Sequence, residues 1–284
     1  MYPRRILEEK LLHLLAEDVG QGDVTTSAVV PSKCKAEANV IAKSDGVVAG
    51  IEETVTLAEA LGLNVDCFVD DGVKIKENQV LMKLTGKAAT ILTAERTMLN
   101  LLSRMSGIAT ATRTLNEKIN KAKLKTRIAA TRKSAPGLLY FDKKAVIIGG
   151  GDPHRLHLDD MILIKDNHIA VAGNITEAVK RARQNASFSK KIEVEVTTAE
   201  DALKVAELGV DIVMLDNFSP QEIKELMKHW KKKGFCGIMT EASGGITSKN
   251  ILEFAATGVD VISMGELTHS VEALDISLEI VKTV

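Results

Sequence analysis

The stretch from residue 192 to residue 217, IEVEVTTAEDALKVAELGVDIVMLDN, alternates between the pattern of a buried strand and that of an amphipathic helix. Its two ends, Ile192–Val196 and residues 212–215, are short apolar runs typical of strands. Between them, Thr198 followed by Asp201 marks a helix start, because a threonine side chain can cap the N–H groups of a first turn. A strand, a helix and a second strand in this order predict parallel strands with a right-handed crossover.

The same alternation continues on both sides of this stretch. We predict further strands at residues 127–131, 161–164, 237–239 and 261–264. Another helix start is Ser219 to Glu222, where a cap, a first-turn proline and a capping-box acid follow in order. Six such units in about 140 residues favour an open, incomplete parallel α/β barrel, since a full eightfold barrel takes ~250 residues. A doubly wound open sheet is the alternative geometry.

The first hundred residues follow a different pattern. Residues 6–17 have helical apolar spacing, and short alternating runs at 36–43, 46–51 and 80–84 predict a small antiparallel sheet. Two long helices are predicted at 88–103 and 110–121, separated at Gly107. The last residues, 270–284, are predicted to form one more helix that packs on the first domain. We therefore expect an N-terminal domain over 1–109, joined by the C-terminal helix 270–284, and a barrel domain over 110–269.

Composition excludes several classes of partner. Lys and Arg total 37 against 38 Asp and Glu, so a net charge of −1 gives no basic surface for nucleic acid, and 3% aromatic residues leave little for base stacking. The three cysteines lack metal-binding spacing and suit a reducing compartment. No apolar run approaches the ~18 residues of a membrane span, and the first residues lack an apolar signal core. We expect a cytoplasmic protein that binds neither nucleic acid nor membrane.

Polar or glycine residues mark the carboxyl end of each predicted barrel strand. In parallel barrels and in open α/β sheets this edge binds ligands, because the loops converge there. A single polar residue after a strand is ordinarily the start of a loop, but six marked ends with charges of both signs indicate a site. The six ends are Thr131-Arg132-Lys133, Lys165 to His168, Glu193 with Glu195, Asp216-Asn217, Glu241 to Gly245, and Gly265.

Glu193 and Glu195 are two residues apart and therefore share one face of their strand. In a parallel strand covered by helices, that face looks into the barrel, where carboxylates need cations. Lys165, Arg132 and Lys133 are the nearest cations in the predicted strand order. A purely structural network of ions is the alternative interpretation.

Two loops carry the signs of a phosphate site. Residues 241–247 combine a strand end, Gly244-Gly245 and a predicted helix start, and residues 263–269 bear Gly265 in the next loop. Glycines allow close backbone approach, and free amides at a helix start bind oxyanions. The glycine-rich loop at 149–151 leads to His154 and Arg155 near the same cations. Because Lys and Arg crowd the histidines there, the pattern favours an acidic small molecule over a metal ion.

Taken in order, these motifs resemble the quinolinate phosphoribosyltransferase family, also called nicotinate-nucleotide pyrophosphorylase (carboxylating). The resemblance rests on TRKSAPG at 131–137, GGG with His154-Arg155, LIKDNH at 163–168, EVEV at 193–196, MLDNF at 214–218 and EASGGI at 241–246. It extends to EDVG at 17–20, SGIAT at 106–110 and Gly265 with THS at 268–270, and so covers nearly the whole chain.

The resemblance implies an N-terminal α/β sandwich and an open α/β barrel, with the last helix rejoining the first domain. It implies a homodimer, or a hexamer built from dimers, in which one subunit's N-terminal domain closes the partner's barrel. The implied reaction is decarboxylating phosphoribosyl transfer from phosphoribosyl pyrophosphate to quinolinate, in de novo NAD biosynthesis. Quinolinate is then expected to contact residues matching Thr131, Arg132, Lys133, His154, Arg155 and Lys165, with Arg96 reaching across the dimer.

The resemblance also places phosphoribosyl pyrophosphate. It implies catalytic roles for Lys133, Glu195 and Asp216, with Mg²⁺ carried mainly by the pyrophosphate and lying near the two acids. The residues expected to bind phosphoribosyl pyrophosphate are Lys133, Lys165, Glu195, Asp216, Ser243, Gly244, Gly245, Gly265 and His269.

The chain departs from the family pattern at three positions. Ser134 replaces the usual Thr, Pro153 stands where Asn is common, and Leu139 stands where an Arg is common, which removes a cation near the acid pocket. The alternatives are a related enzyme acting on nicotinate, or the molybdenum-transport-associated paralogue of the family. A carrier module of the biotinyl or lipoyl type is disfavoured, because no modifiable lysine lies at a hairpin tip in the usual setting.

Overall fold

The computed structural model describes residues 2–283 and divides the chain into two compact units. Unit 1 comprises Met1–Ala111, Tyr140–Gly150 and Val271–Val284, and unit 2 comprises Thr112–Leu139 and Gly151–Ser270. Residues 140–150, which we expected within the barrel, therefore cluster with unit 1. Among the described residues, no helix has both the length and the hydropathy needed to cross a membrane.

Unit 2 is built on a six-stranded parallel sheet. Its strands are β6 (Arg127–Ala130), β7 (Ile162–Ile164), β8 (Ile192–Val196), β9 (Ile212–Asp216), β10 (Met239–Ser243) and β11 (Val261–Met264). They lie in the order β6-β11-β10-β9-β8-β7. The first strand in the chain, β6, pairs with the last, β11, and the strands from β11 to β7 then neighbour one another in reverse chain order. This is the cyclic order of a barrel with its opening between β6 and β7. The open barrel is confirmed, and the doubly wound alternative is wrong.

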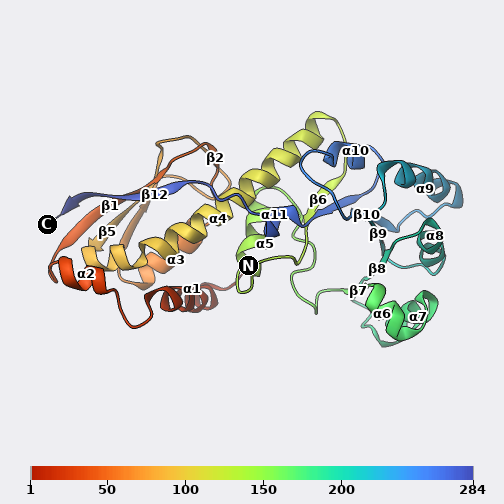
Figure 1. Ribbon diagram of the computed structural model, residues 1–284, viewed down its shortest axis with the longest axis horizontal. Coiled ribbons are helices and arrows are strands. Elements are labelled where there is room, and N and C mark those ends of the chain that lie inside the picture. The colour runs from red at the N-terminus through yellow and green to blue at the C-terminus, as the bar shows by residue number, and fades with distance from the viewer. Residues whose placement is uncertain (1, 284) are drawn as a thin grey trace. The chain divides into compact units, whose positions relative to one another are not determined.

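Helices cover the outside of this sheet and follow the predicted caps. They are α6 (Asp166–Ala172), α7 (Ile175–Asn185), α8 (Ala199–Glu207), α9 (Pro220–Lys233), α10 (Ile251–Ala255) and α11 (Glu266–His269). Thr198 caps α8 by accepting the Asp201 N–H at 3.1 Å, and Ser219 with Glu222 forms the capping box of α9. Helices α8 and α9 lie on the outer side of the sheet (Figure 1). Their buried residues, including Trp230, belong to one core cluster with Val194 and Val213 of the sheet.

The position of β10 differs from the sequence prediction. The predicted strand at 237–239 ends where the actual strand begins, and Gly237 has a φ of 111° outside it. Apolar periodicity misses β10 because its buried residues include Thr240 and Glu241, whose side chains the barrel accommodates. The following helix was also placed too early, since α10 begins only at Ile251.

Unit 1 contains two antiparallel sheets and five helices within the described residues. The larger sheet has the order β12-β1-β5-β3, and β2 pairs with β4. The strands of the two sheets are β1 (Lys35–Ala42), β2 (Gly46–Val47), β3 (Asn64–Cys67), β4 (Lys74–Ile75), β5 (Val80–Lys87) and β12 (Ile276–Thr283). Its helices are α1 (Arg4–Val19), α2 (Val24–Val29), α3 (Ile51–Ala60), the first part of α4 (Ala88–Lys121) and most of α5 (Leu139–Ile148). The mixed α/β class of this unit agrees with the prediction.

The predicted C-terminal helix over 270–284 is wrong. Residues 276–283 form strand β12, which pairs antiparallel with β1 from Ala42↔Ile276 to Ala36↔Thr283. The run ISLEIVKT is rich in β-branched residues, which favour strands, and β1 offers it a free edge. Val284 lies outside the described residues. The prediction that 46–51 is one strand is wrong too, because Gly46–Val47 is the strand and Ile51 begins α3.

The two predicted helices at 88–103 and 110–121 are one continuous helix, α4, of 34 residues (Figure 1). Gly107 does not interrupt it. A Cβ on Gly107 would lie 2.1 Å from the carbonyl oxygen of Glu272, so the glycine lets a neighbouring segment of unit 1 approach the helix. Gly107, which in the sequence indicates a helix break, instead allows close packing against the helix.

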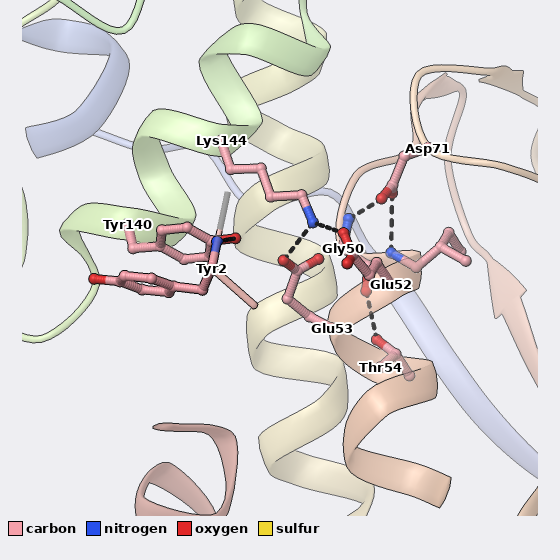
Figure 2. Close-up of polar contacts among 9 residues, drawn as sticks. Tyr2, Gly50, Glu52, Glu53, Thr54, Asp71, Tyr140 and Lys144 are labelled. Atoms are coloured by element: carbon pink, nitrogen blue, oxygen red, sulfur yellow. Dashed lines mark hydrogen bonds and ion pairs between the residues drawn. The ribbon is translucent and has the colours of Figure 1, made fainter. Parts of the chain in front are cut away.

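Helix α5 is held within unit 1 by buried charges. Figure 2 shows Lys144 of α5 reaching two glutamates on α3. Its Nζ lies 2.6 Å from Oε1 of Glu53, whose side chain is fully buried, and also pairs with Glu52. The carboxylate of Asp71 caps α3 by accepting the N–H groups of Gly50 at 2.7 Å and Ile51 at 2.9 Å. Polar side chains thus fix both helices.

Candidate active site

The carboxyl ends of the barrel strands surround a cavity of about 430 Å³ in unit 2. This is the edge at which the sequence predicts the site. The volume lies in the range of small-molecule sites, about 300–1,000 Å³. The lining residues are Ala130, Thr131, Arg132, Lys133, His154, Arg155, Leu163, Lys165, Glu195, Met214, Asp216, Glu241, Ser243 and Ser263.

Four basic side chains line this cavity from three segments. Arg132 and Lys133 follow β6, Lys165 follows β7 at the start of α6, and Arg155 lies in the turn after Asp152. Asp152 forms a bridge with Ala129 of β6, which brings its turn to the open side of the barrel. Burial and the nearby charge of Arg132 lower the pKa of Arg155. The cations therefore repel one another and favour a polyanionic ligand.

Two carboxylates face these cations. Glu195, on β8, forms an ion pair with Lys165, and its side chain is 14% exposed against 39% for the lysine. Asp216 ends β9 and accepts a hydrogen bond from Nδ2 of Asn217 at 2.7 Å. The prediction that the acids of β8 look into the barrel and meet cations is right for Glu195.

A second group of charges lies deeper in the barrel. Nε2 of His154 is 3.1 Å from Oε2 of Glu241 and 3.4 Å from Oε2 of Glu193. Burial disfavours a charged ring, whereas the hydrogen bonds and charges of the two glutamates favour it and raise the pKa of His154. Burial also raises the pKa of Glu193.

The three side chains of this cluster could also be metal ligands by their spacing. The hydrogen bond on the other ring nitrogen argues against that use. Nδ1 accepts the N–H of Arg155 at 2.8 Å, so it holds a lone pair and Nε2 carries the ring proton. A metal ion on Nε2 would require the opposite tautomer. The arrangement fits a proton-bearing cluster better than a metal site.

The glycine loops lie beside the cations. Gly244 has a φ of 89°, and a Cβ there would lie 2.2 Å from Oδ1 of Asn217, so no other residue fits without displacing the end of β9. A Cβ on Gly265 would meet His269 at 2.9 Å and Lys133 at 3.4 Å. Both loops therefore bring backbone close to the cavity's charged edge, as a phosphate site requires.

His168 has a structural contact. Its Nδ1 accepts the backbone N–H of Lys165 at 3.0 Å, so it helps to begin α6 and fixes the segment that carries Lys165. It is not one of the residues that line the cavity within the described chain.

Most of the predicted site residues come together here. Thr131, Arg132, Lys133, His154, Arg155, Lys165, Glu195, Asp216 and Ser243 line the cavity, and Gly244, Gly265 and His269 lie next to lining residues. Gly245, with a φ of 62°, follows Gly244 in the same loop. Arg96 lies on α4 in unit 1, and its contribution to a partner's site stays a prediction.

Sequence reasoning missed several lining residues. Leu163 and Met214 are apolar strand residues that chemistry does not single out, and Ser263 lies inside β11. Glu241 was quoted as part of a strand end but received no role. The strand register could have revealed Glu241, because it pairs with Met214 and Val261 inside the sheet. A carboxylate buried there is costly unless it has a polar partner.

Comparison with known proteins identifies the family. The model of the quinolinate phosphoribosyl transferase N-terminal domain matches residues 23–106, and that of the C-terminal domain matches residues 108–279. The chain belongs to the quinolinate phosphoribosyl transferase family. The resemblance stated from the motifs is thereby confirmed.

Relatives of the chain match it along nearly their whole length. A probable nicotinate-nucleotide pyrophosphorylase [carboxylating] of Methanothermobacter thermautotrophicus is 46% identical over 94% of this chain and 96% of the relative. One of the same name from Bacillus subtilis is 42% identical over 96% of this chain and 93% of the relative. The solved nicotinate-nucleotide pyrophosphorylase of Francisella tularensis is 35% identical, with a TM-score of 0.89, 99% of this chain and 98% of that chain covered.

Proposed function

We propose that the protein is a quinolinate phosphoribosyltransferase (decarboxylating), a pentosyltransferase of de novo NAD biosynthesis. Its products would be nicotinate mononucleotide, pyrophosphate and CO2. The observation that carries the proposal is the cavity itself, in which four cations face two carboxylates at the carboxyl edge of an open barrel. Relatives named nicotinate-nucleotide pyrophosphorylase [carboxylating], which match over almost the full chain, support the same reaction.

The acid is held by the basic side chains. Quinolinate bears two adjacent carboxylates, and Arg forks and Lys point charges are the groups that recognise carboxylates. Arg132 follows β6, Arg155 lies in the turn that Asp152 joins to β6, and Lys133 and Lys165 line the same cavity. Burial and the nearby charge of Arg132 lower the pKa of Arg155, and the repulsion between the two cations is relieved when a dianion binds.

The phosphoribosyl group lies between the acids and the glycine loops in this proposal. The ring nitrogen of quinolinate attacks C1 of the ribose as the bond from C1 to pyrophosphate breaks. The sugar becomes positive and the leaving group negative, so Glu195 and Asp216 stabilise the ribose while Lys133 and Lys165 stabilise the pyrophosphate. Ser243, Gly244, Gly245, Gly265 and His269 would hold the phosphates.

Decarboxylation follows from the new charge on the ring. With its nitrogen alkylated, the ring withdraws the electron pair of the bond to the 2-carboxylate, CO2 leaves, and the ring carbon takes a proton from water. The protein's part is to hold the charged groups in place and to keep the ring facing the cations. No covalent intermediate with a side chain is needed.

Mg²⁺ fits the site as an ion brought in by the pyrophosphate. Asp216 and Glu195 supply carboxylate oxygens at the cavity, and oxygen donors of this kind suit Mg²⁺, which keeps substrate phosphates and water as its other ligands. The ion would neutralise charge on the leaving pyrophosphate.

We further propose a homodimer, or a hexamer built from dimers, in which Arg96 contributes to the partner's acid pocket. The support for this is the family resemblance. Free cysteines at positions 34, 67 and 236 suit the reducing cytoplasm that we expect for the protein.

The deciding experiment compares two acids. Purified protein with phosphoribosyl pyrophosphate and Mg²⁺ is supplied with quinolinate or with nicotinate, and the release of pyrophosphate and CO2 is measured. We expect turnover with quinolinate and equal amounts of the two products. Turnover of nicotinate without CO2 would instead indicate the second candidate function, a related enzyme that acts on nicotinate. Leu139, which stands where the family commonly has an arginine, favours that alternative.

Variants test the acid pocket. Arg132→Ala or Lys165→Ala should abolish quinolinate binding in calorimetry while the far-UV circular dichroism stays that of the unchanged protein. Unaltered affinity in either variant would refute the assignment of that cation.

A further inference from the structure

The inference concerns His154, which the resemblance places among the ligands of the acid. Both of its ring nitrogens are engaged within the protein. Nδ1 accepts the backbone N–H of Arg155 at 2.8 Å, and Nε2 faces Oε2 of Glu241 at 3.1 Å. A hydrogen-bond donor can serve the substrate only if it is not already used, so His154 has no nitrogen to offer the acid.

His154 also has an unfavourable backbone conformation. Its φ is 53°, in the left-handed region that residues other than glycine seldom adopt. Such a conformation persists only where surrounding contacts fix it. Here the N–H of His154 donates to Oδ1 of Asp152 at 2.7 Å, and the two ring contacts fix the side chain.

This conformation decides where Arg155 lies. Asp152 is joined to β6 by its N–H to Ile128 at 2.8 Å and by its carbonyl to Ala130 at 3.0 Å. From that anchored residue, the left-handed turn at His154 directs the chain so that Arg155 lines the cavity together with Arg132. The ring of His154 bridges the amide of Arg155 to Glu241 on strand β10.

We infer that Glu241 is a positioning residue for acid binding, which accepts the Nε2 proton of His154 and so fixes the turn that presents Arg155. Glu193, whose side chain is fully buried, lies 3.4 Å from the same nitrogen and is a second acceptor within reach. The inference rests on the proposed function, because Arg155 is taken to bind quinolinate.

An acceptor at position 241 is the requirement, rather than a negative charge. Glu241→Gln keeps a carbonyl oxygen for the Nε2 proton, whereas Glu241→Leu has a similar size and offers none. We expect Glu241→Leu to raise KM for quinolinate about tenfold, the effect of losing roughly 1.4 kcal/mol of binding. Glu241→Gln should stay within about threefold of the unchanged enzyme. KM for phosphoribosyl pyrophosphate should change little in both.

A matched control separates positioning from loss of stability. Glu53 of unit 1 is equally buried, so Glu53→Leu destabilises the fold without altering the acid pocket. It should leave KM for quinolinate unchanged. Equal impairment of Glu241→Gln and Glu241→Leu would overturn the inference, because charge and not the acceptor would then matter. Normal KM values in both would overturn it as well.

A second measurement needs no variant at position 241. In ¹⁵N-histidine-labelled protein free of ligand, the His154 ring, assigned by its disappearance in His154→Asn, should carry a proton on Nε2 at pH 7. An Nε2 without a proton would refute the inference even if every variant failed to fold. Because this spectrum involves no substrate, it is independent of the proposed function, whose own failure would appear as absent CO2 release by the unchanged enzyme.

Discussion

Removing the cation at Lys144 should strongly destabilise the protein, because it leaves a carboxylate buried without a partner. The Lys144 side chain is 3% exposed and that of Glu53 is fully buried (Figure 2). At their separation of 2.6 Å, a dielectric constant near 20 gives a gross attraction of about 6 kcal/mol. Most of that offsets the desolvation of two ions, but Lys144→Met loses the attraction and keeps the desolvation of Glu53.

We expect Lys144→Met to lower the free energy of unfolding by about 3–5 kcal/mol, the range for a broken buried pair. The double variant Lys144→Met with Glu53→Gln removes both charges and should recover most of that loss. Urea denaturation provides the measurement, followed by far-UV circular dichroism and by the fluorescence of Trp230, the sole tryptophan of the sequence, which reports on unit 2. Coincidence of the two signals tests whether one transition is present.

The effect should depend on pH with a definite sign. Burial raises the pKa of Glu53, so the folded state binds a proton on this group more tightly than the unfolded chain, in which the ordinary pKa is about 4.3. Its protonated form is therefore favoured by folding, and stability from this group is lost as pH rises through the folded pKa. Without Lys144 that pKa rises further, so acidification from pH 7.5 to 5.5 should reduce the deficit of Lys144→Met.

A surface pair provides the control. Lys76 and Asp45 are largely exposed, and Lys76→Met should produce no resolvable change. If Lys144→Met and the double variant with Glu53→Gln are destabilised equally, the loss does not come from an unpaired carboxylate and the reasoning fails.

Three other predictions follow from single positions. Gly244→Ala adds a Cβ that would overlap Asn217, and should reduce kcat/KM for phosphoribosyl pyrophosphate at least about tenfold. Gly258→Ala is the control and should keep normal kinetics, because Gly258 has a similar φ of 91° and its added Cβ would meet open space. Gly107→Ala should lower the melting temperature, although alanine ordinarily stabilises a helix, because its Cβ would meet the Glu272 carbonyl; a raised melting temperature would show that the neighbouring segment yields. Hydrogen bonds from Thr26 lower the pKa of Asp23, the cap of α2, so stability from this carboxylate is lost as pH falls below about 4. Asp23→Asn should remove that part of the acid dependence, and an unchanged dependence in acid denaturation would count against it.

The sequence predicted the barrel and its site better than it predicted unit 1. Barrel strands are local apolar runs, and polar residues mark their carboxyl ends. The sequence alone therefore predicts that Lys165, Glu195 and Asp216 lie at the site. β10 was misplaced because Glu241 and Thr240 are buried polar residues, which periodicity treats as loop. Residues 276–283 form a strand because they pair with the edge of β1, which lies more than two hundred residues earlier in the chain. A local sequence pattern does not reveal so distant a partner. The role of His154 depends on a tautomer, which a sequence does not encode locally.

The pairing of β12 with β1 has a consequence for the order in which a nascent chain acquires structure. Unit 1 is assembled from three separated segments, and the last of them leaves the ribosome after all of unit 2. The 148 residues of unit 2, Thr112–Leu139 and Gly151–Ser270, are complete before that stretch emerges. The usual N-to-C succession of domains is thus reversed. While synthesis continues, the edge of β1 that β12 later covers is open, and an open strand edge is a template for pairing with another chain.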